Sequence, residues 1–264
     1  MTRIITVANQ KGGVGKTTTA CNIAASLAQE GAEVLLIDLD PQGNASTAMG
    51  VAHHEGVAGI YEVLTDELPI SEVVEPAEGV AHLYAVPATI DLAGAEIELV
   101  SLVAREYRLK KAIEAYLPEH EEFHGKPVEY VFIDCPPSLG LLTLNALVAA
   151  TEVLLPIQCE YYALEGLSQL MKTLEMVRTH LNPELAVGAI LLTMYDGRTR
   201  LAAQVAEEVR THFGERVLTT VIPRSVRVSE APSHSQTVMT YDPVSSGALS
   251  YRDAARELAK VYDG

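Results

Sequence analysis

The sequence predicts a single α/β domain built on a largely parallel, twisted sheet with helices on both faces. Short runs rich in β-branched residues alternate with longer stretches of helical spacing throughout the 264 residues. Several of the runs are almost wholly apolar, as is typical of parallel strands that are covered on both faces. No Pro/Gly/Ser-rich stretch is long enough to serve as a linker between domains. We therefore expect residues 1–264 to fold as one unit.

The strands are expected at regular intervals along the chain. A β-branched run over 4–8 ends in a glycine-rich turn, and the run over 34–39 is nearly all apolar. The same pattern recurs and predicts further strands over 128–133, 153–157, 187–193 and 217–222.

Helical spacing follows or separates these strands. Ile23, Ala24, Leu27 and Ala28 recur on one face of a helix expected over 17–29, and Gly31 stands where a helix C-cap belongs. The remaining helices are expected over 93–116, 139–149, 164–181, 201–213 and 247–261. Helices of this length between strands indicate right-handed crossovers.

Two segments are expected to be exposed loops, 50–60 and 118–127. The second carries His120, Glu121 and His124, which are metal-ligating residue types. No other motif converges on this segment, so we interpret it as a solvated loop rather than as a metal site.

One stretch, 139–157, is apolar enough to suggest a membrane span. Asn145, Glu152 and Pro156 interrupt it, so a helix followed by a short strand is the better interpretation. At the N-terminus, Lys11 and the residue before it interrupt the apolar run too early for a signal peptide. We therefore expect a soluble, cytoplasmic protein.

Charge and cysteine usage narrow the possible functions. Nineteen Lys and Arg against 35 Asp and Glu give a net charge of −16, so any contact with nucleic acid must come from a local patch. Cys21, Cys135 and Cys159 are odd in number and far apart. This excludes a paired disulfide framework and any C-x-x-C motif, and it suits a reducing compartment.

The most informative segment is a glycine-rich loop between the first strand and the first helix. Its glycines allow backbone N–H groups to converge on phosphate oxygens, and the helix N-terminus adds partial positive charge. Lys16 would reach the β- and γ-phosphates, and the Thr17 hydroxyl would bind Mg²⁺. Gln10 stands where the strict P-loop pattern has glycine, and Lys11 is additional. The residues expected around the phosphates are Lys11, Gly12, Gly13, Val14, Gly15, Lys16, Thr17 and Thr18.

This loop resembles the deviant Walker A motif of the ParA/MinD superfamily of ATPases. Further stretches resemble the chromosomal ParA (Soj) proteins, namely 34–46, 132–138, 158–167 and 226–233. The resemblance as a whole extends from residue 3 to about residue 255. The resemblance implies ATP and Mg²⁺ as cofactors. It also implies that Lys11 acts with Lys16 in catalysis by reaching the partner's nucleotide across a dimer interface.

Carboxylates that follow the predicted strands agree with this resemblance. Asp38 and Asp40 lie at the carboxyl end of an expected buried strand, where ligands bind in open α/β sheets. We interpret Asp40 as the residue that orients the attacking water, and Asp134 as a Mg²⁺ partner acting through a water. The alternative is that each aspartate caps the turn after its strand.

The resemblance also implies a base site and a DNA-binding surface. The adenine is expected at Pro223 and Ser225, the second of which is usually asparagine in this group. Arg198 and Arg227 fall on family positions that contact DNA phosphates. The alternatives are a simple turn at Ser225 and a solvated surface at the arginines.

The segment that contains these arginines is locally positive. Between Gly197 and Val228 it has six arginines (198, 200, 210, 216, 224 and 227) against three acids (207, 208 and 215). Arginine suits binding that rests on phosphate neutralisation. Two departures remove positive charge from this region: 233–236 lacks the family's glycine and lysine, and 243–247 lacks two arginines.

The expected function is that of a DNA-partitioning ATPase. ATP and Mg²⁺ would clamp two subunits into a sandwich dimer that binds double-stranded DNA non-specifically, which makes the protein nucleoid-associated. Hydrolysis, stimulated by a ParB-type centromere-binding partner, would release the dimer.

Two alternatives share the fold. A MinD-like membrane ATPase needs a C-terminal basic amphipathic helix, but 251–264 has three cations, three acids and mostly alanine as its apolar residue. A metabolic or redox relative is the other: a nitrogenase-type iron protein, an iron–sulfur scaffold or a carboxylate-activating synthetase. The three cysteines are more simply explained as small buried residues.

Overall fold

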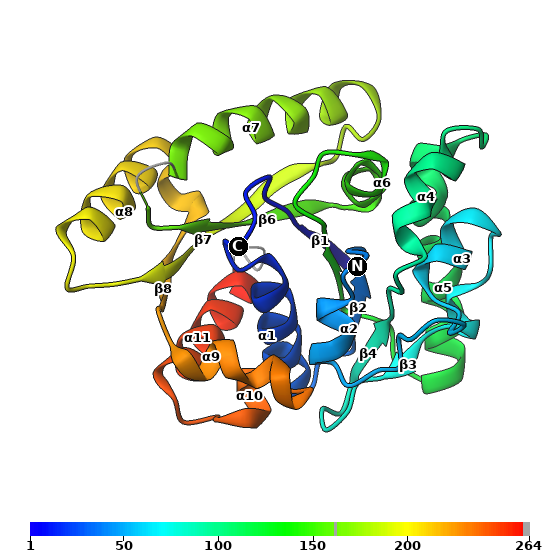
Figure 1. The fold of residues 1–264 in the computed structure, drawn as a ribbon, viewed down its shortest axis with the longest axis horizontal. Coiled ribbons are helices and arrows are strands. Elements are labelled where there is room, and N and C mark those ends of the chain that lie inside the picture. The colour runs from blue at the N-terminus through cyan, green and yellow to red at the C-terminus, as the bar shows by residue number, and fades with distance from the viewer. Residues whose placement is uncertain (161–162, 261–264) are drawn as a thin grey trace.

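The computed structural model describes residues 1–160 and 163–260 and contains one eight-stranded sheet (Figure 1). All neighbouring strands are parallel except β3 and β4, which confirms the predicted fold class. In spatial order, the strands are β3 (Glu75–Pro76), β4 (Leu83–Val86), β2 (Val34–Asp38), β5 (Tyr130–Asp134), β1 (Arg3–Val7), β6 (Glu152–Gln158), β7 (Ala186–Tyr195) and β8 (Val217–Pro223).

Helices cover both faces of the sheet (Figure 1). One face is covered by α1 (Lys16–Gln29) and α11 (Ser246–Lys260), together with the short helices α2 (Asn44–Ala48) and α10 (Val238–Tyr241). The other face is covered by α3 (Ile60–Thr65), α4 (Leu92–Leu99), α5 (Arg108–His124), α6 (Leu141–Ala149), α7 (Ala163–His180) and α8 (Arg200–Phe213). The short α9 (Val226–Glu230) follows β8, and single 3₁₀ turns lie at Ile70–Glu72, Arg105–Tyr107, Gly214–Arg216 and Ala231–His234.

The apolar strands divide their side chains between two hydrophobic cores. In β2, Leu35 and Ile37 belong to the core under α3–α8, whereas Val34 and Leu36 belong to the core under α1 and α11. Successive side chains of a strand point to opposite faces, so a strand covered twice must be apolar at every position. This explains why the β2 segment shows no alternation.

The expected helix over 93–116 is wrong, because the chain breaks between α4 and α5. Ala104 adopts a left-handed conformation, with φ of 51°. The buried Asn145 of α6 stabilises the break, since its side chain accepts from the N–H of Leu109 at 3.2 Å and donates to the carbonyl of Arg105 at 2.9 Å. Tertiary hydrogen bonds thus override a continuous helical pattern.

The expected exposed loop over 118–127 is also wrong. Helix α5 continues through Pro118 to His124, and Gly125 ends it with φ of 71°. The buried face of α5, at Leu109, Ile113, Tyr116 and His120, keeps helical spacing beyond the proline. Packing of that face outweighs the missing hydrogen bond at Pro118. The other expected loop, 50–60, is a loop up to Ile60, where α3 begins, but it is only partly exposed, because Val51 and Gly59 are buried.

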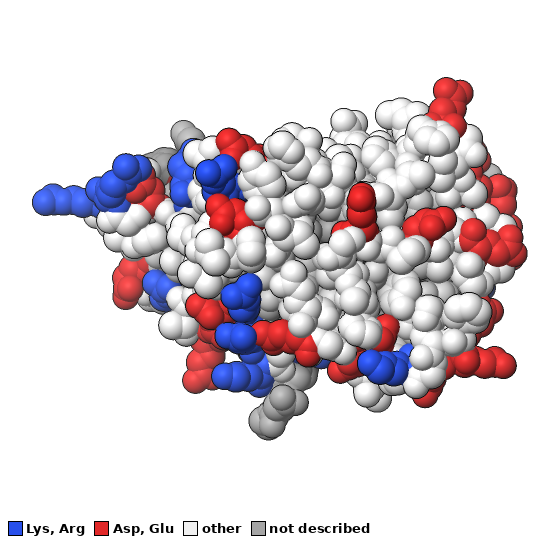
Figure 2. All heavy atoms as spheres, turned by 90° about the horizontal axis from the view of Figure 1, so that it is seen from below, with Lys and Arg blue, Asp and Glu red and all other residues white. Residues whose placement is uncertain are grey.

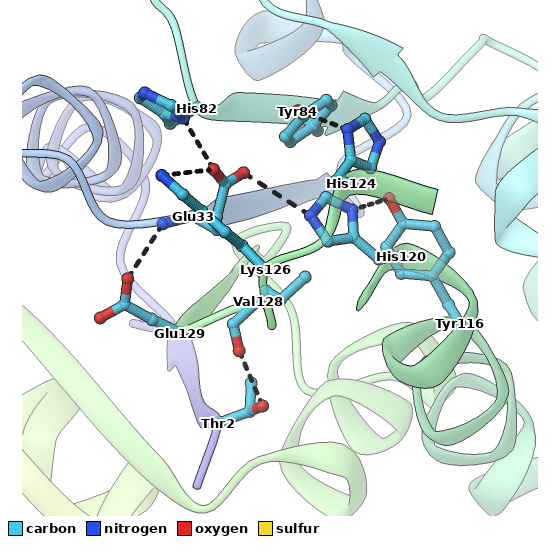
Figure 3. A network of polar contacts seen from close by, with 10 residues as sticks. All are labelled: Thr2, Glu33, His82, Tyr84, Tyr116, His120, His124, Lys126, Val128 and Glu129. Carbon is cyan, nitrogen blue, oxygen red and sulfur yellow. Dashed lines mark hydrogen bonds and ion pairs between the residues drawn. The ribbon is translucent and has the colours of Figure 1, made fainter. Parts of the chain in front are cut away.

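The histidines of α5 belong to a partly buried polar network at the amino ends of β2 and β4, opposite the carboxyl ends described below (Figure 3). His120 is 2% exposed, its Nδ1 bonds the Tyr116 hydroxyl at 3.0 Å, and its ring stacks on that of His124. Its Nε2 faces Glu33, which also accepts from His82 at 2.7 Å. This network joins β2, β4 and α5.

The apolar stretch 139–157 forms α6 and β6, as predicted. Within the described parts of the chain, no helix has both the length and the apolar character needed to cross a bilayer.

The buried His120 makes stability depend on pH. Burial and the nearby His124 lower the pKa of His120, although Glu33 acts in the opposite direction. The unfolded chain, with a histidine pKa of about 6.5, therefore takes up this proton more readily than the folded chain does, and stability is lost as the pH falls below that value. The fall in melting temperature from about pH 7.5 to about pH 5.5 should be smaller for His120→Gln than for the unaltered chain. Replacing the exposed His180 by Gln is the control. Equal falls in all three proteins would contradict this role.

Candidate functional site

The glycine-rich loop between β1 and α1 is anchored to the neighbouring strands by side chains. Asn9 donates to the carbonyl of Pro156 at 2.8 Å and accepts from the N–H of Lys11 at 3.0 Å. The Thr193 hydroxyl donates to the carbonyl of Val14 at 2.8 Å. The ends of β6 and β7 therefore fix the path of the loop.

The backbone of the loop suits an anion. Gly13 and Gly15 adopt left-handed conformations, with φ of 74° and 87°, which only glycine adopts without strain. Gly12 is exposed, and an added Cβ there would meet no atom within 4 Å. No described side chain caps the N-terminus of α1, so no side-chain acceptor competes with an anion for the N–H groups of its first turn.

Lys16 supplies the positive charge of the loop. The residue is 7% exposed, and its Nζ donates to the carbonyl of Lys11 at 3.3 Å, so that the ammonium lies across the loop. Burial lowers the pKa of Lys16, while Asp134 and Asp40 act in the opposite direction. Thr17 and Thr18 follow in the first turn of α1 and are partly buried.

Asp38 and Asp134 lie opposite each other at the carboxyl ends of β2 and β5. Asp134 is fully buried, and its two carboxylate oxygens have no hydrogen-bond partner of good geometry among the described residues. Burial and the charge of Asp38 raise the pKa of Asp134 well above its ordinary value, and the Thr17 hydroxyl and Lys16 act against this shift. A buried carboxylate with free acceptor oxygens fits a divalent cation held between Asp134 and Thr17.

Asp38 is better satisfied than Asp134. Its oxygens accept hydrogen bonds from the N–H groups of Asp40 and Ser46 and from the Ser46 hydroxyl. Burial still raises the pKa of Asp38 to about 6. Asp40 lies in the following loop, where one of its carboxylate oxygens accepts from the N–H of Gln42 at 3.0 Å.

Lys11 lies at the rim of the loop and not over it. Its Nζ forms an ion pair with Glu160 at 3.1 Å, just after β6, and both side chains are partly exposed. Glu160 could not be singled out from the sequence, because the pair joins residues 149 positions apart.

Pro223 and Ser225 lie beside the loop, on a pocket of about 110 Å³ that Gly15 and Thr18 also line. The same pocket includes side chains that the sequence did not suggest, from the end of β7, from α9 and from α11; they are Thr193, Met194, Val228, Ser229 and Tyr251. Their separation along the chain leaves no local signal that could have identified them.

Arg198 and Arg227 follow β7 and β8, whose ends pair at Tyr195 and Pro223. The Arg198 side chain is 88% exposed, and its guanidinium pairs with Asp196 at 2.9 Å. Arg227 pairs with Glu230 at 3.2 Å and with Asp242 at 3.4 Å. The structure therefore places both arginines on the surface, each beside an acid.

Charge is distributed unevenly over the surface. In Figure 2, most of the visible Lys and Arg side chains lie toward the side of the molecule where Figure 1 places α8, β8 and α9. The opposite end, which contains α3–α5, carries mostly Asp and Glu. The segment 197–228, which is locally positive in the sequence, thus lies on the side of the folded protein where most of the visible Lys and Arg side chains are found.

Comparisons with known proteins identify the family of the chain. A family model described as an AAA domain matches residues 2–187. The chain is 51% identical to Sporulation initiation inhibitor protein Soj of Bacillus subtilis (strain 168), over 98% of this chain and 99% of that protein. It is 52% identical to Chromosome partitioning protein ParA of Myxococcus xanthus (strain DK1622), over 98% and 88% of the two chains.

Solved structures share the whole fold. Cobyrinic acid a,c-diamide synthase from Mycobacterium smegmatis, with bound ADP and magnesium, superposes with a TM-score of 0.84 at 37% identity and covers 100% of this chain and 96% of that one. The cell division ATPase MinD of Pyrococcus furiosus superposes with a TM-score of 0.79 at 25% identity, over 99% and 100% of the two chains. Together with the glycine-rich loop, the matches at about half identity over nearly full length show that this chain belongs to the family of ParA and Soj chromosome-partitioning ATPases.

Proposed function

We propose that this chain is a partitioning ATPase whose ATP-bound dimer binds double-stranded DNA non-specifically and is released by hydrolysis. The observation that carries the proposal is the anion-binding loop with Lys16 close to Asp134, a buried carboxylate whose oxygens have no hydrogen-bond partner of good geometry among the described residues. Such a pair of opposite charges suits a nucleotide phosphate together with a metal ion. Relatives that are named chromosome-partitioning proteins support the biological role.

The proposed ligands are ATP and Mg²⁺. The loop from Gly12 to Thr18 would hold the phosphates, and Pro223 and Ser225 would contact the base from the adjoining pocket. Thr17 would bind Mg²⁺ directly and Asp134 through a water, and the ion would supply charge neutralisation on the phosphate oxygens. Asp40 would orient the attacking water. The diamide synthase structure, which contains ADP and magnesium, supports ATP and Mg²⁺ as the ligands.

The proposed dimer forms at the face that carries the loop. Gly12 is exposed with open space before it, and Lys11 lies at the same rim. Lys11 would leave Glu160 and contact the nucleotide of the second subunit. ATP would then act as a timer, because its hydrolysis removes the γ-phosphate that holds the two subunits together.

The proposed DNA surface includes Arg198 and Arg227. Two weak patches, one from each subunit, become a bivalent surface on dimerisation, which increases avidity without any additional interaction. Binding of this kind would make the protein nucleoid-associated in the cytoplasm. A ParB-type protein would stimulate hydrolysis.

The described part of α11 argues against the MinD-like alternative. Its apolar face, including Tyr251 and Leu258, is buried against the sheet and α1. A membrane-binding helix needs that face free. The C-terminal residues 261–264 lie outside the described residues.

The metabolic and redox alternatives receive less support. Cys21, Cys135 and Cys159 are all buried, and burial raises the pKa of each thiol, which opposes the thiolate form that clusters need. The identity to the diamide synthase, 37%, is lower than the 51% identity to Soj. We therefore favour the partitioning function.

Lys16→Ala should abolish ATP binding, because it removes the buried ammonium that would meet the phosphates. Calorimetry with Mg-ATP measures this directly. Lys111→Ala, which removes an exposed lysine of α5, should bind as the unaltered chain does. Retained tight binding in the Lys16 variant would contradict the phosphate-loop assignment.

Gly12→Val should spare nucleotide binding and block ATP-dependent dimerisation. The backbone of Gly12 is not left-handed and its Cβ position is open, so the single chain tolerates the substitution. The branched side chain would stand where the second subunit approaches. Light scattering with and without ATP measures the dimer, and a normal ATP-dependent dimer would exclude Lys11 from a sandwich interface.

Replacing Arg198 and Arg227 by Ala should weaken binding to all duplex sequences about equally. The slope of log affinity against log salt should fall by about one unit for each phosphate that is no longer neutralised, and by twice that if both subunits contribute. ATP-dependent dimerisation should survive. Arg178→Ala is the matched control, because Arg178 is also an exposed arginine paired with an acid, Glu175, but lies on α7. An unchanged salt slope in the double variant would show that these arginines do not bind DNA phosphates.

A further inference from the structure

Both ends of the loop that contains Asp40, residues 40–46, donate hydrogen bonds to the carboxylate of Asp38. The N–H of Asp40 donates to one oxygen of Asp38 at 3.2 Å. Six residues later, the N–H and the hydroxyl of Ser46 both donate to the other oxygen at 2.7 Å. Hydrogen bonds to an ionised acceptor are about twice as strong as neutral ones. The buried carboxylate of Asp38 therefore holds the two ends of the loop close together.

Ser46 also connects this loop to the neighbouring strand. Its hydroxyl accepts from the N–H of Ala88 at 3.0 Å, two residues after β4, while it donates to Asp38. A hydroxyl has a single proton, so donating to Asp38 and accepting from Ala88 fixes its orientation. Ser46 is 1% exposed, and no bulk water competes for these bonds.

The hydrogen bonds inside the loop transmit this restraint to Asp40. The carbonyl of Asp40 accepts from the N–H of Gly43, and its side chain accepts from the N–H of Gln42. Gly43 is left-handed, and a Cβ there would lie 3.0 Å from the carbonyl oxygen of Ala88. The turn therefore fits closely against the Ala88 backbone, and its position depends on the same residues that Ser46 joins.

The phosphate loop is anchored by a different set of bonds. Asn9 and Thr193 hold it to β6 and β7, and neither contacts Asp38 or Ser46 in any hydrogen bond of the described residues. Removal of the Ser46 bonds would thus move Asp40 without moving the phosphate-binding groups.

We propose that Ser46 is a positioning residue for ATP hydrolysis, which with Asp38 holds the Asp40 loop in place. This inference rests on the proposed ATPase function and on the assignment of Asp40 to the attacking water. Misplacement of a water-orienting group slows the chemical step more than it weakens binding. Ser46 therefore affects the turnover of bound ATP and not its affinity.

The test compares three variants in single-turnover hydrolysis of Mg-ATP and in calorimetry. In Ser46→Ala the hydrolysis rate should fall about tenfold, with the ATP dissociation constant within about twofold of the unaltered value. Ser46→Cys, which nearly keeps the volume but is a weak donor, should show the same fall without a cavity. Thr47→Ala is the matched control on the same helix. The Thr47 hydroxyl contacts His53 and the carbonyl of Gly43 but neither Asp38 nor Ala88, and the Thr47 N–H still donates to that carbonyl in the variant. It should hydrolyse ATP at the unaltered rate.

Amide hydrogen exchange supplies a readout that is independent of turnover. Exchange over residues 40–46 should be faster in both Ser46 variants and unchanged in Thr47→Ala. Normal hydrolysis in both Ser46 variants, or a parallel loss of ATP affinity, would overturn the positioning role. Asp40→Ala is run alongside: if it hydrolyses ATP normally, the assignment of Asp40 fails and the inference fails with it, a result distinct from normal rates in the Ser46 variants alone.

Discussion

The register of the central strands brings the buried acids and the phosphate loop together at the carboxyl ends of those strands. Asp134 pairs with Val7 on one side and with Asp38 on the other, and the loop starts directly after β1. The hydrophobic cores on both faces fix this register, because a shift by one residue would turn every strand side chain to the opposite core. The positive charge of Lys16 acts against the raised pKa of Asp134. The remaining features of the site depend on this arrangement.

The site is divided between two supports that share no hydrogen bond among the described residues. Side chains at the ends of β6 and β7 hold the phosphate loop, whereas Asp38 and Ser46 hold the loop that carries Asp40. If Asp40 has the role proposed above, nucleotide binding and hydrolysis therefore depend on different hydrogen bonds.

Charge is segregated by region on the surface of this acidic protein. The net charge of −16 is spread unevenly. In Figure 2 most of the visible Lys and Arg side chains lie toward the side where Figure 1 places α8 and β8, and mostly Asp and Glu lie at the opposite end. The exposed arginines also pair with nearby acids, such as Asp196, whose pKa Arg198 lowers to about 2. Such exposed pairs contribute little to folding stability.

Local patterns in the chain were sufficient to predict the fold class, six strands, the first helix and the glycine-rich loop that precedes it. Each has a local cause: apolar runs in doubly covered strands, helical spacing, and glycines at left-handed positions such as Gly13 and Gly15. Where a helix ends or continues depends instead on tertiary packing. Asn145 ends the helical run before α5, and the buried face that includes His120 carries α5 through Pro118, because packing and buried hydrogen bonds outweigh local preference. The contacts of Ser46 and the pocket beside Pro223 also depend on the tertiary structure. Both bring together residues that are far apart in the chain, so neither leaves a pattern in the sequence.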